Sequence, residues 1–429
     1  MRERSTWCLA AMVVGVVGPG ALAQWTFTNL HPVGATESAA MGVGAAGGTV
    51  RVVGYAAVGA NYHAALWGTT ATSFVDLHPV TTAGPNSVAY ATDGVQQVGV
   101  VFTSSPIGAA SIWTGTATSW QNVTPVLPFG TAGVIYGVAA NVQVGATTTG
   151  GTSLSRQASS WSGIGGVLNR GGTALLATDG ASHVGYSGGQ GFPIPSAVNA
   201  GLWMGSNFAA TSLHPSGMHS SSAAGVSGTQ QVGWYQASQF SDSRRACLWT
   251  GTGASKVDLH PSIAVRSEAT GVSAGVQVGS VYVTDPANPF GTVSRAAAWS
   301  GTAASFVNLH DVLPPTYATS VASGVWSGGG MTYVSGSAWN NTTSRTEAVL
   351  WVFTADQACD SIDFNGDGLF PDTQDIADFL TVFGGGVCAG QQTSEPPCNV
   401  DIDFNNDGLF PDTEDIGALI RVFGGGACP

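Results

Sequence analysis

The chain has 429 residues and a formal net charge of −13 at pH 7. Residues 24–354 carry ten acidic and nine basic side chains, whereas residues 355–429 carry fourteen acidic and one basic. The long, nearly neutral part has no basic stripe, which excludes nucleic acid as a partner, and the abrupt change in charge indicates two domains.

The first residues have the pattern of a secretory signal peptide. Arg2 and Arg4 precede an apolar stretch over residues 7–17, and Ala-Leu-Ala follows at 21–23. That stretch is too short to cross a bilayer, and no later segment approaches the roughly 20 apolar residues that a span needs. We therefore expect a bacterial Sec-type signal peptide over 1–23, no membrane span, and a protein that is secreted, extracellular or held at the cell surface.

A pattern ending in tryptophan recurs through the long part. The spacing between successive anchors is 42 to 52 residues, slightly above the period of four-stranded propeller blades. The seven anchors are Trp67, Trp113, Trp161, Trp203, Trp249, Trp299 and Trp351. Seven anchors predict seven repeats.

Each repeat contains the signals of four short strands. The dipeptides Asp93-Gly94 and Asp179-Gly180 are typical of a tight hairpin between the first two strands. The second strand carries Val-Gly-aromatic, the third ends at the anchor tryptophan, and Gly-Thr leads into a fourth strand, as in residues 73–79.

The ends of the repeat region complete one another. Residues 25–32 match a fourth strand without a third before it, and residues 348–351 match a third strand with little room for a fourth after it. Closing the ring with these two fragments would remove the exposed sheet edges of an open array. The sequence therefore predicts an all-β fold, a seven-bladed β-propeller of four-stranded repeats over residues 24–354.

Residues 63–67 (His-Ala-Ala-Leu-Trp) and 73–77 (Ser-Phe-Val-Asp-Leu), which follow Val-Gly-Tyr, resemble the HAF repeats of exported bacterial proteins. The resemblance covers most of the 24–354 region. It implies an extracellular repeat domain without a settled biochemical activity.

The tail contains two copies of one acidic loop, aligned at an offset of 40 residues. Each begins Asp-x-Asn-x-Asp-Gly, which supplies side-chain oxygens at positions 1, 3 and 5 of an EF-hand loop and a backbone carbonyl at position 7. The predicted ligands are Asp363, Asn365, Asp367 and the Leu369 carbonyl in the first copy, and Asp403, Asn405, Asp407 and the Leu409 carbonyl in the second. We expect two bound Ca²⁺ ions.

The distal ligand is less regular, because position 12 holds Gln374 in one copy and Glu414 in the other. Asp375 and Asp415 are favoured, since they alone near that position are acidic in both copies, and they imply a loop one residue longer. Two further acids, Asp372 and Asp412, are additional candidates that would bind through water; as N-cap residues they would instead satisfy the first amides of a helix.

An amphipathic helix is predicted after each loop. The apolar positions follow i, i+3, i+4, i+7 spacing, and Gly-Gly-Gly ends each helix. They are Ile376, Phe379, Leu380 and Phe383 in the first copy and Ile416, Leu419, Ile420 and Phe423 in the second. The tail is thus predicted to be a small α-helical, duplicated, EF-hand-like domain over 355–429.

Loop-plus-helix pairs with flanking cysteines resemble dockerin domains. Cys359 and Cys388 bracket the copy at 359–388, and Cys398 and Cys428 bracket the copy at 398–428. Four cysteines allow three pairings, and the duplication favours one disulfide within each copy. The resemblance implies attachment to a cohesin-like module of a scaffold or cell-surface protein.

Five histidines share one repeat position, directly after a leucine; they are His31, His78, His214, His260 and His310. A ring of histidines is one hypothesis for a metal site. The other is that a repeated polar turn residue bonds the neighbouring blade, and we favour it because repetition alone explains the pattern.

The turns that carry these histidines lie at the same end of every blade as the loops between second and third strands, because successive strands are antiparallel. Those loops vary most at 187–201, 236–245 and 284–295, and they carry Phe192, Phe240 and Phe290. They indicate a face that binds protein or glycan; variable solvated loops without a ligand are the alternative.

Catalytic signals are sparse, and no catalytic residue is assigned. Asp76 and Asp258 repeat as fourth-strand residues, and Cys247 occupies a small buried position before a tryptophan. The favoured interpretation is a secreted, non-enzymatic propeller attached through its calcium tail; the alternative is a dockerin-borne carbohydrate-active enzyme, a glycoside hydrolase or polysaccharide lyase. Three or more acids gathered together would favour the enzyme, from among Glu37, Asp93, Asp179, Asp242, Glu268, Asp285 and Glu347.

Overall fold

The structure is a computed structural model. It describes residues 24–80, 84–102, 108–125, 131–149, 155–162, 167–169, 173–188, 197–205, 208–238, 243–285, 288–354, 364, 373–384, 404 and 413–424. The chain has two compact units, of which one is Trp25–Phe353 and the other contains the two tail helices.

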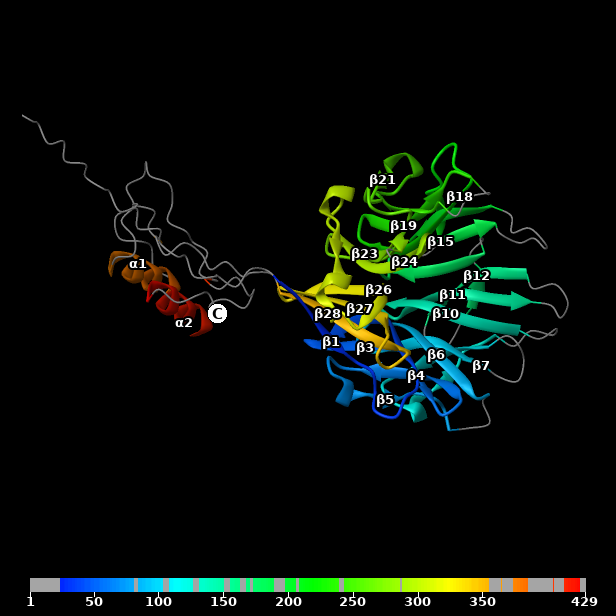
Figure 1. Ribbon diagram of the computed structural model, residues 1–429, viewed down its shortest axis with the longest axis horizontal. Helices are drawn as coiled ribbons and strands as arrows, with labels where there is room; N and C mark the ends of the chain where they lie inside the picture. The colour runs from blue at the N-terminus through cyan, green and yellow to red at the C-terminus, as the bar shows by residue number, and fades with distance from the viewer. Residues whose placement is uncertain are drawn as a thin grey trace, which may run out of the picture. The chain divides into compact units, whose positions relative to one another are not determined.

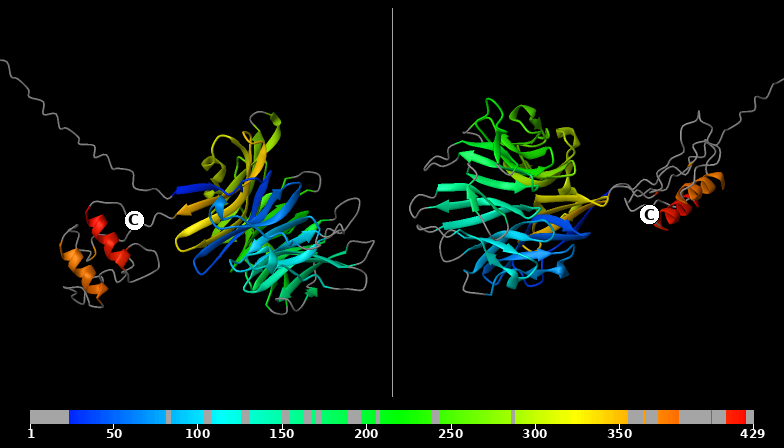
Figure 2. Two further views of the ribbon diagram at one scale, coloured as in Figure 1. Left: turned by 90° about the horizontal axis from the view of Figure 1, so that it is seen from below. Right: turned by 180° about the vertical axis from the view of Figure 1, so that it is seen from behind.

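Seven antiparallel sheets of four strands form the larger unit, and their colours succeed one another around the domain in Figures 1 and 2. Blade 1 consists of β2 (Ser38–Ala46), β3 (Thr49–Val58), β4 (Asn61–Trp67) and β5 (Val75–Asp76). Blade 2 consists of β6 (Asn86–Thr92), β7 (Gln97–Phe102), β8 (Ala109–Trp113) and β9 (Gln121–Asn122). Blade 3 consists of β10 (Thr131–Ala139), β11 (Val142–Thr149), β12 (Ser155–Ser162) and β13 (Val167–Asn169).

The other four blades repeat this order. Blade 4 consists of β14 (Ala174–Thr178), β15 (Ser182–Gly188), β16 (Val198–Met204) and β17 (Ala209–Ser212). Blade 5 consists of β18 (Ser220–Ser227), β19 (Gln230–Gln236), β20 (Arg245–Trp249) and β21 (Val257–Asp258). Blade 6 consists of β22 (Arg266–Ser273), β23 (Val276–Asp285), β24 (Asn288–Trp299) and β25 (Val307–Asn308). Blade 7 consists of β26 (Tyr317–Gly328), β27 (Met331–Asn340), β28 (Arg345–Thr354) and β1 (Gln24–Asn29).

Blade 7 closes the ring as predicted, since its strand order is β1-β28-β27-β26. The amide of Leu30 donates to the Ala348 carbonyl at 2.8 Å, and the Thr26 hydroxyl donates to the Val352 carbonyl at 3.3 Å. The prediction of a seven-bladed, all-β propeller is confirmed.

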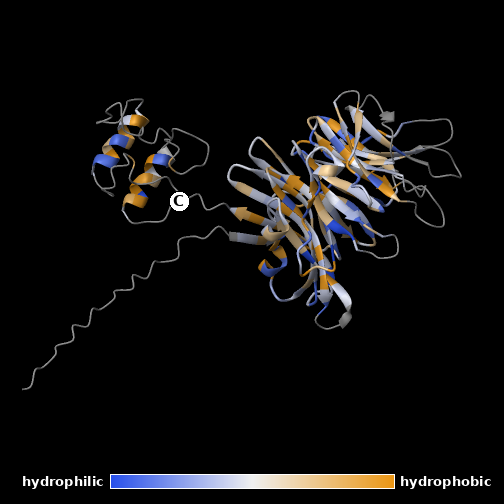
Figure 3. Cartoon of the chain, turned by 90° about the horizontal axis from the view of Figure 1, so that it is seen from above, coloured by the Kyte–Doolittle hydropathy of each residue, from blue (hydrophilic) through white to orange (hydrophobic). Residues whose placement is uncertain are grey.

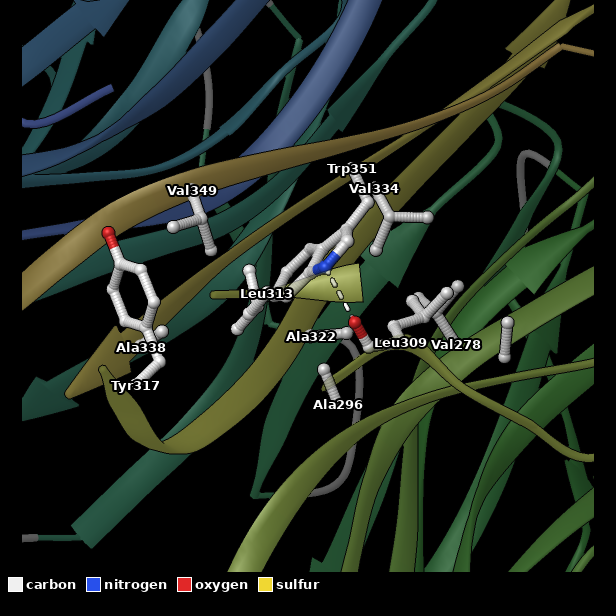
Figure 4. Packing of buried hydrophobic residues seen from close by; sticks show 11 residues of the cluster. Val278, Ala296, Leu309, Leu313, Tyr317, Ala322, Val334, Ala338, Val349 and Trp351 are labelled. Carbon is white, nitrogen blue, oxygen red and sulfur yellow. Dashed lines mark hydrogen bonds between the residues drawn. The ribbon is translucent and has the colours of Figure 1, made fainter. Parts of the chain in front are cut away.

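The anchor tryptophans form the cores between blades. All seven are buried, and each packs with aliphatic residues of its own blade and of a neighbouring one. Figure 4 shows the Trp351 side chain in such a cluster, with its indole N–H donating to the Leu309 carbonyl at 2.9 Å. The repeat period thus reflects one core-filling side chain per blade.

A β-bulge recurs in the first strand of every blade. In blade 1 the register between β2 and β3 shifts between Ala40 and Gly42, which leaves Met41 as the extra residue. The glycine of the Val-Gly-aromatic motif lies opposite this bulge. A Cβ on Gly54 would lie 1.9 Å from the Ala39 carbonyl oxygen, so only glycine fits.

The fourth strands are shorter than the sequence predicts. Within residues 73–79, only β5 is extended, because a 3₁₀ turn precedes it and the Asp76 side chain accepts the His78 amide directly after it, at 2.8 Å. The 3₁₀ turns are η1 (Ala71–Ser73), η2 (Ala117–Ser119), η3 (Gly253–Ser255), η4 (Ala303–Ser305) and η5 (Leu309–Val312).

Residues 284–295 also differ from the variable loop that the sequence predicts there. Strands β23 and β24 continue as a paired hairpin through this segment, with Asp285 opposite Asn288. Phe192 and Phe240 lie outside the described residues, and Phe290 is part of β24.

The tail unit contains the two predicted helices, α1 (Thr373–Phe383) and α2 (Thr413–Phe423). A small core joins them through Phe364, Phe379 and Phe404, where the Phe379 ring lies edge-on to both others at centroid distances of 5.2 and 5.9 Å.

The predicted apolar faces of these helices are partly wrong. Leu380 and Ile420 are 47% and 59% exposed, whereas Val382 and Val422 pack against the core. Each helix therefore has apolar residues on more than one side, as the mixed hydropathy colours along α1 and α2 in Figure 3 show. None of the helices in the described ranges is long and apolar enough to span a membrane.

Candidate functional site

The repeated histidines connect neighbouring blades. In blade 1, His78 Nδ1 lies 2.8 Å from the Ser87 hydroxyl of β6, and that hydroxyl accepts the Ala64 amide of β4 at 2.8 Å. The same relay occurs at His31 with Ser38, His214 with Ser221, His260 with Ser267, and His310 with Ser320. At the position without histidine between blades 2 and 3, the Thr124 hydroxyl accepts the Ala110 amide at 2.8 Å.

Burial favours the neutral form of four of these histidines. Burial lowers the pKa of His310 to about 4, with Arg295 adding to the shift, and burial also lowers the pKa of His31, His78 and His260. Nε2 of His31 lies 3.0 Å from the Ala35 carbonyl oxygen, so Nε2 carries the proton and Nδ1 accepts from serine. The interpretation that this residue bonds the neighbouring blade agrees with the geometry.

The acids that would have indicated catalysis do not gather among the described residues. Asp93 and Asp179 lie in first-hairpin turns, where each Oδ1 accepts two backbone amides. Glu268 pairs with Arg244 at 2.9 Å. No group of three histidine, cysteine or acidic side chains placed to hold a metal occurs in the described part of the chain, and Asp242 lies outside it.

Glu347 is a structural carboxylate. It is 1% exposed and accepts hydrogen bonds from all four strands of blade 7 or the turns between them. The donors are Asn29 (2.9 Å), Tyr317 (2.8 Å), Asn340 (3.2 Å), Thr343 (2.9 Å) and Arg345 (2.8 Å). Burial opposes ionisation, but these donors outweigh it and lower the pKa of Glu347 to about 2.

An open cleft lies between blades 1 and 2, on the face predicted to bind. Its lining residues are Tyr55, Tyr62, Asn86, Val88 and Phe102, and its volume is about 400 Å³. The rings of Tyr55 and Tyr62 meet edge to face at 5.2 Å, and Tyr62 is 43% exposed. The Asn86 side-chain oxygen Oδ1 accepts a hydrogen bond from the Tyr62 backbone amide at 2.8 Å, which fixes the start of β4 against β6.

Glu37 places a carboxylate on two of the residues that line this cleft. Its Oε1 accepts the Tyr55 hydroxyl at 3.0 Å and its Oε2 accepts the Tyr62 hydroxyl at 3.3 Å. Burial raises the pKa of Tyr55, and the neighbouring Glu37 charge raises it further. Both phenols therefore keep their protons and point them at one carboxylate.

Two further cavities continue from Phe102. A slot of about 170 Å³ between blades 2 and 3 is lined by Phe102 and, at its inner end, by Tyr90 and Tyr136. These two tyrosines are bulge residues whose rings lie 5.4 Å apart, and they also line the central channel, a cavity of about 380 Å³. Phe102 thus lines both the cleft and the slot, and Tyr90 and Tyr136 line both the slot and the channel, an aromatic lining that suits a ring-shaped ligand.

Solved structures with a similar fold come from enzymes. Puromycin hydrolase aligns at a TM-score of 0.46 and 11% identity over 77% of this chain, which spans only 56% of the hydrolase. An oligogalacturonate lyase from Vibrio parahaemolyticus aligns at 0.44 and 10% identity over 78% of this chain and 98% of the lyase. The propeller domain of the Trilobed protease from Pyrococcus furiosus aligns at 0.42 and 8% identity over 73% of this chain and 95% of that domain. No family model matches the sequence, and no curated protein does either.

These neighbours correct the expectation of a non-enzymatic binding protein. The neighbours named as enzymes are peptidases and oligogalacturonate lyases, which is contrary to that expectation. At such low identity the likeness shows the fold alone, so any reaction has to be argued from the cleft itself.

The predicted calcium ligands lie mostly outside the described residues. Those outside are Asp363, Asn365, Asp367, Leu369, Asp372, Asp403, Asn405, Asp407, Leu409 and Asp412, together with the cysteines Cys359, Cys388, Cys398 and Cys428. Asp375 and Asp415 are described, and both are fully buried in the first turn of their helices. Asp375 Oδ1 accepts the Phe364 amide at 3.0 Å.

Two buried carboxylates in equivalent first turns fit the donor set of a calcium site, since Ca²⁺ binds carboxylate and carbonyl oxygens.

Cys247, as predicted, is a buried strand residue, and burial raises the pKa of its thiol well above the usual range.

Sequence reasoning named Glu37 among the candidate acids but assigned no role to Tyr55, Tyr62, Asn86 or Phe102. The sequence signal that could have identified them is a change of residue type at a repeat position. Phe102 follows a motif glycine by three residues, where blade 1 has Ala57, and Tyr62 precedes an anchor tryptophan by five, where blade 2 has Gly108. Bulky residues at repeat positions that hold small ones in a neighbouring blade could have indicated the cleft.

Proposed function

We propose that the propeller is a carbohydrate-active enzyme that binds a sugar chain in the cleft between blades 1 and 2. The observation that carries this proposal is the aromatic lining of that cleft, continued by Phe102, Tyr90 and Tyr136 toward the channel. Aromatic faces stack on the apolar face of a sugar ring, while the tyrosine hydroxyls and Asn86 offer polar groups at the edge.

Glu37 supplies the acid–base chemistry of this proposal. It accepts hydrogen bonds from Tyr55 and Tyr62, so its carboxylate has a fixed position beside the cleft. In hydrolysis, the Glu37 carboxylate would take a proton from the water that attacks the anomeric carbon, and the leaving glycosidic oxygen would then take that proton. A lyase would act on a uronate, whose negative charge Glu37 would repel, so hydrolysis is the better reaction.

The tail has a separate role in the proposal. We infer an exported protein with HAF-like repeats, whose dockerin-type tail binds two Ca²⁺ ions and docks on a cohesin-like scaffold or cell-surface protein. Asp375 and Asp415 support it, because two acids buried in equivalent first turns are suited to a cation. The Asp-x-Asn-x-Asp-Gly loops would supply the remaining ligands, and the flanking cysteines would form a disulfide within each copy.

The test is turnover of a polysaccharide panel by the full chain, with neutral, uronate-containing and amino-sugar polymers, read as new reducing ends and by mass spectrometry. We expect release of shorter chains from at least one polymer, and a loss of at least about 100-fold in kcat for Glu37→Gln. Arg244→Ala is the matched control, since Arg244 holds in blade 5 the repeat position of Tyr62 and should leave the rate unchanged. Absence of product from every polymer would overturn the proposal.

A further inference from the structure

The residues that line the cleft between blades 1 and 2 have repeat equivalents between blades 5 and 6. The repeat places Trp234 where Tyr55 is, Arg244 where Tyr62 is, and Arg266 where Asn86 is. It also places Glu268 at the position of Val88 and Tyr282 at that of Phe102.

Between blades 5 and 6, the chain's own arginines lie on the aromatic rings. The Arg244 guanidinium is 5.2 Å from the Trp234 ring centre, and the Arg266 guanidinium is 3.7 Å from that of Tyr282. Glu268 Oε1 lies 2.9 Å from Arg244 and 3.6 Å from Arg266. Here the two guanidinium groups therefore lie on the aromatic rings and also pair with the carboxylate.

The blade 1–2 cleft has the same aromatic faces and a carboxylate beside it, but none of its five lining residues is cationic. Tyr55, Tyr62 and Phe102 present rings, and Glu37 holds the two phenols. Negative ring faces next to a carboxylate attract an organic cation. Comparison of the two pairs of blades thus indicates that a ligand of the blade 1–2 cleft carries a positive charge.

We propose that this cleft binds the protonated amino group of an amino-sugar chain. This inference rests on the proposed carbohydrate function and names its substrate class. The ammonium would lie over the tyrosine rings beside Glu37 Oε2, and the sugar rings would follow Phe102 toward Tyr90 and Tyr136.

A basic peptide could offer the same charge, but the cleft fits it less well. An extended peptide binds best along an unpaired strand edge. Here Tyr55 of β3 is already paired with Ala64 of β4, and Asn86 of β6 is paired with Phe102 of β7. The cleft therefore offers a ligand the faces of aromatic rings, and these suit the rings of a saccharide.

The experiment is calorimetric titration of the full chain with three tetramers of the same linkage: β-1,4-linked glucosamine, its N-acetylated form, and glucose. We expect the glucosamine tetramer to bind about tenfold more tightly than the other two, in line with a cation–π contact and a nearby carboxylate. Added salt should reduce that preference. Glu37→Gln should abolish it, whereas the matched variant Glu268→Gln between blades 5 and 6 should retain it.

The outcomes separate the two proposals. Equal affinity for all three tetramers, unchanged by Glu37→Gln, would overturn the amino-sugar inference and leave the carbohydrate function standing. Failure of every tetramer to bind would also overturn the amino-sugar inference, whereas the carbohydrate function fails only if no polymer of the panel is cleaved. Tighter binding of a tetra-arginine peptide that displaces the glucosamine tetramer would replace the sugar with a basic peptide and overturn the inference.

Discussion

Glu347 shows how one side chain can hold a blade together. Its five hydrogen-bond donors come from β1, β26, β27, β28 and the turn before β28, so the carboxylate joins segments that are distant in the sequence. Since the donors favour the charged form, ionisation of Glu347 and closure of blade 7 are coupled.

We predict that Glu347→Gln lowers the free energy of unfolding by about 1–3 kcal/mol at neutral pH, because a neutral amide cannot accept all five bonds. The pKa of Glu347 is lowered from 4.5 to about 2, so its contribution is present above pH 4.5 and is lost as the pH falls toward 2. Chemical denaturation at several pH values measures this. A difference between wild type and variant that persists unchanged at pH 2 would contradict it.

At the scale of the element, the histidine–serine relays make the joints between blades sensitive to acid. Folding lowers the pKa of four of these histidines, and that of His310 moves from 6.5 to about 4. Below pH 6.5 the unfolded chain therefore binds protons that the folded propeller does not.

The melting temperature of the propeller should accordingly fall as the pH is lowered from about 6.5 to about 4, a range above that in which Glu347 titrates. Scanning calorimetry across this range is the measurement. His310→Gln should flatten part of the slope, while Asp93→Asn, a change in a hairpin turn, should not. A melting temperature that stays constant between pH 7 and pH 5 would contradict the prediction.

The sequence predicted the strands and blades well, but it did not predict which residues line the cleft. Trp67 and its six equivalents fill the cores, so their spacing predicts the blades directly. Tyr62 and Phe102, by contrast, come from different repeat positions in different blades, and only packing of one blade on the next brings them together. The exposure of Leu380 was missed because helical spacing cannot tell which of several apolar residues faces the core.

At the scale of the whole molecule, the two compact units should respond differently to calcium. We predict two thermal transitions, of which Ca²⁺ raises only the one that belongs to the tail, because ligand binding stabilises the unit that binds it. Replacing Asp363 and Asp403 together with alanine should abolish that shift. Calorimetry with no heat of binding at millimolar Ca²⁺ would contradict the calcium assignment, and Asp93→Asn serves as the acidic control in the propeller.

The closure of blade 7 also has a consequence for the order of events in folding. Strand β1 is the first strand of the propeller to be synthesised, yet its partner β28 follows some 300 residues later, and the Thr26 to Val352 bond spans a separation of 326 positions. Contacts so distant in sequence form slowly, because a long loop must close first. During synthesis β1 therefore waits unpaired until every other blade has been made, and the ring is completed in the final step.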